Sequence, residues 1–130
     1  MNRAPTHIPT LAAQFATVTT KQEFGYALRD YLDQFRVAPD AALLQEEPAL
    51  LDARLQDGGV ADAYLAAAAA WLSHQHGISA PDWAQESKRI LEIPFFAAKT
   101  HGLRMILLQE SPAEFRVRNL FVSANALSRA

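Results

Sequence analysis

The alanine-rich stretch at residues 60–76 constrains the fold of this chain more than any other part of the sequence. It contains five consecutive alanines at residues 66–70, and alanine has the highest helix propensity of the common residues. Gly77 follows, and glycine readily adopts the left-handed conformation found at helix C-termini. Small side chains also let neighbouring helices approach closely, so we expect residues 60–76 to form the central helix of an all-α protein. Its larger side chains are Tyr64, Leu65, Trp71 and Leu72.

A second long helix is predicted from residue 21 to about residue 36. Thr20 and Glu23 have the spacing of a capping box, in which the threonine hydroxyl accepts a hydrogen bond from the glutamate N–H and the carboxylate reaches back. The apolar residues that follow recur at steps of three and four, which is typical of an amphipathic helix. They are Phe24, Leu28, Tyr31, Leu32 and Phe35.

Shorter helices are expected elsewhere in the N-terminal half. Thr10 is placed to cap one short helix and Asp40 to cap another, because their side-chain oxygens can accept from the first free N–H groups. Proline is accepted in the first turn of a helix but not in its interior, so Pro48 predicts a further helix over residues 48–57. The glycine pair at 58–59 ends that helix.

The C-terminal block, residues 103–123, contains the densest apolar run of the chain. In one interpretation, residues 103–108 form a fully buried helix that is the innermost packing element. Ser111 and Glu114 then have the spacing of a second capping box, with Pro112 at the first helical position. This interpretation predicts a helix that begins at Pro112.

The alternative is a β-hairpin over residues 104–122, because apolar and polar residues alternate from Phe115 onward. We favour the helical interpretation, since the capping-box spacing coincides with a proline and no upstream segment offers the hairpin a sheet to join. The predicted fold is a single compact all-α bundle of about six to eight helices. An α+β fold with the C-terminal hairpin is the alternative.

Length and composition favour one ordinary globular domain. A chain of 130 residues is long enough to bury roughly two thirds of its unfolded surface, and we expect one domain over residues 1–130 with residues 1–9 as a flexible leader. There is no cysteine, which excludes disulfides and thiolate metal sites. The N-terminus lacks a secretory signal, and the longest apolar run, residues 63–72, is shorter than the about 20 residues needed to span a bilayer. We therefore expect a cytoplasmic protein without membrane contact.

Charge is distributed unevenly along the chain. Residues 1–60 carry five Lys/Arg and eight Asp/Glu, whereas residues 99–130 carry five and two. A basic tail is compatible with an anionic partner, but the net charge of −2 repels phosphate at long range. Weak nucleic-acid binding through this tail is therefore an alternative hypothesis, and nucleic acid is not the partner that we expect.

No catalytic, metal or nucleotide-binding motif is present. His74 and His76 are two residues apart on the predicted helix, so their side chains point about 200° apart and cannot share one metal ion. We assign no catalytic residue, no metal and no cofactor. An enzyme would need a site assembled from distant residues, such as His101, Arg104 and Glu110.

Two groups of residues are candidates for binding. Arg116 and Arg118 are close together near a predicted helix start, where two guanidinium groups can hold a carboxylate or a phosphate. Three aromatic residues near two prolines are typical of core packing under a loop, or of a docking patch for a protein. The candidate binding residues are Arg104, Phe115, Arg116, Arg118, Asn119, Trp83, Phe95 and Phe96.

The tail at residues 107–130 reads LLQESPAEFRVRNLFVSANALSRA. It resembles the end of a set of small uncharacterised bacterial proteins that close on an ESPxEFRxRNxFVSxxxLSRA-type pattern. The alanine-rich helix, the Pro-Asp-Trp turn at 81–83 and the Pro-Phe-Phe step at 94–96 are similar to the middle of those proteins, so the resemblance covers about residues 60–130.

A similar tail follows helix-turn-helix domains in proteins that look like partners of nucleotidyltransferase-type toxins. The resemblance thus implies an all-helical fold and an antitoxin-like or regulatory binding role. It supplies no catalytic residue, and this chain has no recognisable helix-turn-helix segment ahead of the shared part. The leading hypothesis is an interaction domain that binds another bacterial protein through the tail around residues 115–119. A homodimer is also compatible with the alanine-rich helix.

Overall fold

The computed structural model describes residues 8–127. Within this range the chain forms seven α-helices, two short 3₁₀ helices and one pair of two-residue strands, so the prediction of a compact, mostly helical fold is confirmed. None of these helices is long and apolar enough to cross a bilayer. Residues 1–7 of the predicted leader lie outside the described residues. The elements are α1 (Leu11–Gln14), α2 (Lys21–Val37), α3 (Ala42–Gln45), α4 (Asp52–Leu55), α5 (Val60–Gln75), the 3₁₀ helices Asp82–Gln85 and Ser87–Arg89, β1 (Phe95–Phe96), α6 (His101–Glu110), α7 (Ala113–Arg116) and β2 (Leu120–Phe121).

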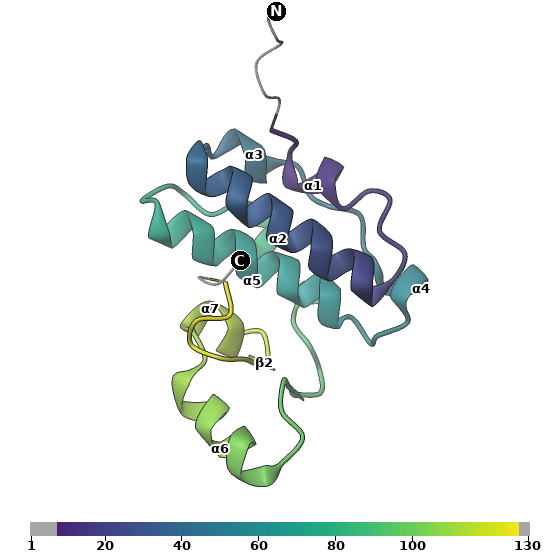
Figure 1. Cartoon of the computed structure of the whole chain (residues 1–130), viewed down its shortest axis with the longest axis vertical. Helices are drawn as coiled ribbons and strands as arrows, with labels where there is room; N and C mark the ends of the chain where they lie inside the picture. The colour runs from purple at the N-terminus through teal and green to yellow at the C-terminus, as the bar shows by residue number, and fades with distance from the viewer. Residues whose placement is uncertain (1–7, 128–130) are drawn as a thin grey trace, which may run out of the picture.

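Helix α5 lies at the centre of the molecule, as its alanines predict (Figure 1). All of its alanines are buried. Helix α2 runs beside it in the same direction: Phe24 packs against Tyr64 with ring centroids 6.0 Å apart near the start of both helices, and Phe35 packs against His76 at 5.3 Å near their ends. The two long helices of the fold are therefore the two that the sequence predicts.

The first turn of α2 contains most of the predicted capping box. The Thr20 hydroxyl accepts a hydrogen bond from the backbone N–H of Glu23 at 3.0 Å. The Glu23 carboxylate turns back one residue further than expected and accepts from the N–H and hydroxyl of Thr19, at 2.8 and 3.0 Å. These hydrogen bonds lower the pKa of Glu23. Helix α2 begins at Lys21, as predicted.

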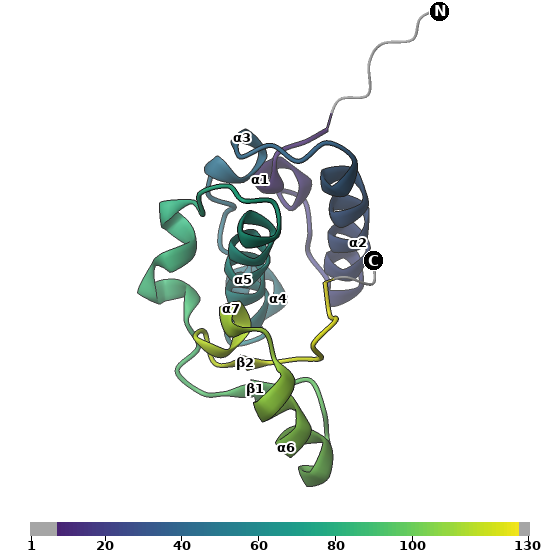
Figure 2. The ribbon, with the colours of Figure 1, turned by 90° about the vertical axis from the view of Figure 1, so that its left-hand side faces the viewer.

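The C-terminal segment covers another side of α5. Phe115 of α7 packs edge-on against Tyr64, with ring centroids 5.0 Å apart. After α7 the chain enters β2, which pairs in parallel with β1, so that Phe95 is opposite Leu120 (Figure 2). The alternative of a hairpin over residues 104–122 is therefore wrong, because β2 takes its partner strand from upstream and α6 occupies the place of the first predicted strand.

The helix predicted over residues 48–57 is only a single turn, α4. The chain before α4 is held in another conformation because its backbone groups bond elsewhere. The N–H groups of Leu51 and Asp52 donate to the carboxylate of Asp62 in α5, at 2.6 and 3.2 Å. The contact with Asp62 thus replaces the first turns of the helix predicted from residue 48, and no local sequence pattern indicates it.

Helix α6 stands away from the rest of the molecule (Figures 1 and 2). Thr100 caps it by accepting from the N–H of Leu103 at 3.3 Å. Leu107 is its only buried residue. The exposed fractions of its other large apolar residues are 52% for Leu103, 47% for Met105, 52% for Ile106 and 39% for Leu108. The prediction that residues 103–108 form the innermost packing element is therefore wrong: the helix exists, but it packs through one side chain.

The predicted capping box at Ser111 and Glu114 is not formed. The Ser111 hydroxyl lies 2.6 and 2.9 Å from the carbonyl oxygens of Leu107 and Val122, and it accepts from the Val122 N–H at 2.8 Å. The Glu114 carboxylate pairs instead with the imidazole of His74 in α5. Ser111 therefore joins the end of α6 to the chain after β2.

Helix α7 begins one residue later than predicted and has a single turn. Pro112 is its N-cap, with an extended backbone at ψ 147°, and Ala113 is its first residue. Proline is still accommodated here because the N–H that it lacks is not needed at a helix start.

Candidate functional site

A fully buried arginine, Arg89, joins three segments of the chain. Its Nε and Nη2 donate to the Glu47 carboxylate at 3.2 and 3.0 Å, and its Nη1 donates to the carbonyl of Asp62 at 3.1 Å. Nη2 also donates to the carbonyl of Pro48 at 2.5 Å. Because protein atoms accept all four of these hydrogen bonds, the guanidinium fixes the chain and does not present a free binding group.

Asp62 is the only charged residue between positions 60 and 73, and its side chain is buried. Burial raises the pKa of the Asp62 carboxyl, while the N–H donors of Leu51 and Asp52 and the charge of Arg89 oppose that rise. The carboxylate holds the chain ahead of α4 against α5. Like Arg89, Asp62 therefore has a structural role.

Two predicted binding residues, Arg118 and Asn119, are bonded into the interior. Arg118 is only 5% exposed. Its Nε and Nη2 donate to the carbonyl of Ala84 at 3.2 and 2.5 Å, and its Nη1 donates to that of Glu114 at 2.7 Å. Burial lowers the pKa of this guanidinium. Asn119 adopts a left-handed backbone with φ 63° and donates through Nδ2 to the carbonyl of Leu91 at 2.6 Å. Both residues attach the C-terminal segment to the segment before β1.

The predicted aromatic residues divide between the core and the surface. Phe115 and Trp83 are buried in the core, and Trp83 Nε1 donates to the carbonyl of Leu44 at 2.8 Å. Phe96 is partly buried and stacks on Phe121, with ring centroids 4.7 Å apart. Phe95 is exposed. Of these aromatic residues, Phe95 is therefore the one most available to a partner.

Two of the predicted arginines are exposed. Arg104 lies over the ring of Phe96 with Cζ 5.6 Å from the centroid, and its Nε donates to the carbonyl of Ala98 at 3.1 Å. Arg116 projects from α7 into solvent. Since Arg118 is buried, Arg116 and Arg118 do not form a common anion site in this structure.

The residues considered for catalysis are also dispersed. His74 pairs with Glu114, and within residues 8–127 no group of three or more His, Asp or Glu side chains is arranged to hold a metal ion. His101, Arg104 and Glu110 all lie on the exposed surface of α6. None of these three residues lines either of the two cavities described next.

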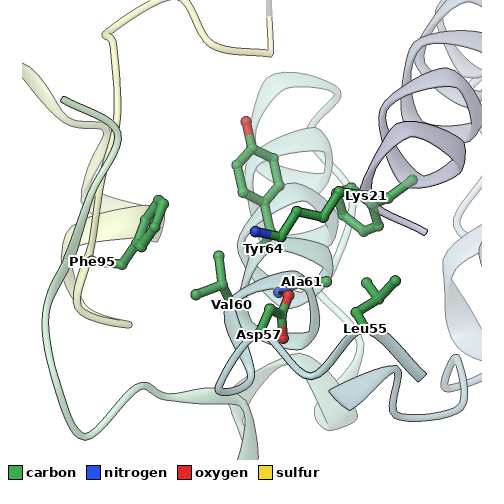
Figure 3. Close-up of a pocket in the computed structure, with 8 residues that line it drawn as sticks. Lys21, Leu55, Asp57, Val60, Ala61, Tyr64 and Phe95 are labelled. Atoms are coloured by element: carbon green, nitrogen blue, oxygen red, sulfur yellow. Dashed lines mark hydrogen bonds between the residues drawn. The ribbon is translucent and has the colours of Figure 1, made fainter. Parts of the chain in front are cut away.

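A small apolar cavity of about 240 Å³ lies between the start of α2, α4, α5 and β1. Figure 3 shows Lys21 extending from α2 toward this cavity and Phe95 on the opposite side. The carboxylate of Asp57, at the cavity floor, accepts from the N–H groups of Gly59 and Ala61 at 3.0 and 2.9 Å. This carboxylate therefore caps the first turn of α5. The apolar lining residues are Phe24, Leu55, Val60, Ala61, Tyr64 and Phe95.

A larger, open groove of about 980 Å³ adjoins the small cavity and shares Asp57, Val60 and Phe95 with it. Lys88 is the one cation among its lining residues, and its Nζ lies 3.2 Å from a carboxylate oxygen of Glu47 and 3.2 Å from one of Glu86. The groove therefore combines apolar contacts with net negative charge. Its exposed apolar residues are Leu50, Ile90, Ile93 and Phe95, and its rim carboxylates are Asp52, Asp57 and Glu92.

Exposed apolar residues are concentrated in one part of the chain. Among the described residues, eleven large apolar side chains are exposed, and eight of these lie between residues 90 and 117. Soluble monomers rarely expose large contiguous apolar patches, and such surfaces commonly mark interaction sites. The eight are Ile90, Ile93, Phe95, Leu103, Met105, Ile106, Leu108 and Val117.

Sequence reasoning did not identify Arg89, Asp62 or Glu47, or the groove beside them. A signal for Asp62 was present, because one carboxylate in an otherwise apolar helix predicts a buried partner. No local signal distinguishes Arg89 from an exposed arginine, since its acceptors lie 27 to 42 residues away in the chain. Comparison with protein-family models, with curated proteins and with solved structures gives no match for this chain.

Proposed function

We propose that this chain is a protein-interaction domain that binds an apolar, basic segment of another protein in the groove. The observation that carries the proposal is the set of exposed apolar residues in the groove, Leu50, Ile90, Ile93 and Phe95. Ile93 is the clearest example, because it lines the groove and 79% of it is exposed. Covering such side chains with a partner removes apolar surface from water.

The charge of the groove supports a basic partner. Asp52, Asp57 and Glu92 lie at the groove, and the positive charge of Lys88 is balanced by Glu47 and Glu86. Complementary charge accelerates encounter with a cationic segment and disfavours an anionic one. An antitoxin-like or regulatory role in a bacterial cytoplasm is part of this proposal, and the resemblance of the tail supports it.

The two alternative functions receive less support from the geometry. An enzyme needs titratable groups that converge on a cavity, whereas the small cavity is mostly apolar and its only carboxylate is committed to the first turn of α5. A nucleic-acid surface needs exposed cations, and burial of Arg118 removes one of the tail arginines from the surface.

Affinity purification of the tagged chain from its native host tests the proposal. The groove variant is Ile93→Asp. The matched control is Val37→Asp, because Val37 is 84% exposed at the end of α2 and lies outside the groove. Wild type and the control are expected to retain the same partner, and the groove variant to lose it.

A binding titration of the recovered partner against each purified chain then measures affinity. We expect at least a tenfold weaker Kd for Ile93→Asp, because a charge is placed in an apolar contact. We also expect weaker binding at higher salt, because the partner is basic. Equal affinity of both variants for the partner would place the contact elsewhere and end the proposal.

A further inference from the structure

Helix α6 carries large apolar side chains around nearly all of its circumference. Leu107 faces the body of the molecule, while Leu103 and Ile106 lie on one flank and Met105 and Leu108 on the other. A helix that is hydrophobic on all sides is normally buried. In this structure about half the surface of these four residues is open to solvent, so α6 has large apolar side chains that no part of the described chain buries.

The charges near α6 are reversed relative to its dipole. Lys99, His101 and Arg104 lie at or just before its N-terminal half, and Glu110 is its last residue. The first turn has no acidic residue and the last turn has no basic one. Cations are unfavourable at the positive end of a helix and anions at the negative end. This arrangement becomes favourable when a second helix runs alongside in the opposite direction.

We propose that α6 pairs antiparallel with α6 of a second copy of this chain. A twofold axis at the helix midpoint lies between Met105 and Ile106, because the helix spans His101–Glu110. Leu103, Ile106 and Glu110 are three and four residues apart and share one flank of α6, and this is the flank that we place against the second copy. In that register Leu103 and Ile106 of one copy meet Ile106 and Leu103 of the other, which is the self-complementarity that an isologous interface requires.

The same register brings opposite charges together. Glu110 of each copy lies at the level of the N-terminal end of the other helix, next to Lys99. Lys99 makes no ion pair within residues 8–127, so its charge is free to be matched. The antiparallel helix dipoles add to the attraction. None of the residues of α6 lines the groove, so this pairing goes beyond the proposed function and does not depend on it.

Sedimentation velocity of the purified full chain at low ionic strength tests the pairing. Wild type is expected to dimerise as its concentration rises. Lys99→Glu and Glu110→Lys each place like charges at both ends of the interface, and we expect each variant alone to dimerise roughly tenfold more weakly.

An equimolar mixture of the two variants is the decisive sample. In the mixed dimer, glutamate at position 99 of one chain meets lysine at position 110 of the other, and at the second contact lysine at 99 meets glutamate at 110. Dimerisation should therefore return in the mixture. The lost hydrogen bond from Ala124 N–H to Glu110, 3.3 Å in length, cannot produce this recovery, because mixing does not restore it. A mixture as weak as its components would reject the antiparallel register.

A disulfide test gives an independent measurement. The chain has no cysteine, so an Ile106→Cys variant can form a disulfide only with another copy. We expect rapid oxidative cross-linking of that variant, and none for Val37→Cys under the same conditions. A wild-type chain that stays monomeric at the highest soluble concentration, with no preferential cross-linking at position 106, overturns the inference. Such a result would not bear on the proposed binding of a separate protein in the groove.

Discussion

The guanidinium of Arg89 lies over the indole ring of Trp83, with Cζ 4.8 Å from the ring centroid. The indole N–H donates to the carbonyl of Leu44 at 2.8 Å, and the guanidinium reaches Glu47 and Pro48. Through these two side chains, the segment that forms one wall of the groove is fixed to α3 and to the chain that follows it. The shape of the groove therefore depends on a buried cation that does not itself face the solvent.

Replacing Arg89 by methionine should destabilise the fold strongly. Methionine has a similar length but cannot donate to the carbonyl of Pro48 or to the carboxylate of Glu47, which would lose their buried donor. We expect a loss of about 3 kcal/mol in the free energy of unfolding, measured by urea denaturation. Arg36→Met is the control, since Arg36 is an exposed member of a surface ion pair and its loss should leave the midpoint nearly unchanged. Equal midpoints for both variants would contradict the structural role of Arg89.

Glu47 should make stability depend on pH in the acid range. Partial burial raises the pKa of its carboxyl, but hydrogen bonds and charge from Arg89 and Lys88 outweigh this and lower it below the ordinary value of 4.5. A lowered pKa means that the ionised form stabilises the fold above pH 4.5 and that this contribution is lost as pH falls through the folded-state value.

A comparison of wild type with Glu47→Gln isolates this contribution. Because other acidic groups titrate in both proteins, only the difference in unfolding free energy reports on Glu47. We expect a difference of up to about 1 kcal/mol at neutral pH, since the carboxylate is partly exposed. The difference should shrink as pH falls below 4.5. A difference that stays constant with pH would show that the charge of Glu47 is not involved.

The two long helices were predictable because their signals are local. The alanine-rich run predicts α5, and the hydroxyl of Thr20 fixes the start of α2 by accepting a hydrogen bond from the N–H of Glu23, three residues later. Such signals act within one or two turns and do not depend on the rest of the fold. The bounds of both helices agree with the prediction to within one residue.

The exposure of α6 was not predictable from its composition. Periodicity and apolar content describe a helix surface, but they do not specify whether that surface meets the same chain or another molecule. Leu103 and Leu107 have the same side chain four residues apart, yet one is exposed and the other is buried. The same ambiguity affects the candidate site, because Arg116 and Arg118 look equivalent in sequence. Arg118 is buried where it donates to the carbonyl of Ala84, and Arg116 is exposed.

The two arginines should therefore respond differently to truncation. Arg118→Ala leaves the carbonyls of Ala84 and Glu114 without a donor, and we expect it to cost about 1–3 kcal/mol of stability. Arg116→Ala removes an exposed side chain and should change stability by less than about 0.5 kcal/mol. Thermal or urea unfolding of both variants provides the measurement. A larger loss of stability for Arg116→Ala would contradict the burial of Arg118 and the exposure of Arg116.

The last prediction concerns how α6 is attached. Leu107 is the single residue through which this helix is buried, whereas Leu103 is about half exposed. Leu107→Ala should cost about 2 kcal/mol or more, because it removes buried apolar contacts and leaves a gap at the base of the helix. Leu103→Ala deletes the same atoms from an exposed position of the same helix, so it is a matched control and should cost less than about 0.5 kcal/mol. Both should be measured in urea at low protein concentration, where association through α6 contributes little. Large and equal losses would mean that α6 packs against its own chain through Leu103 as well as Leu107, and would leave Leu103 unavailable to a second copy.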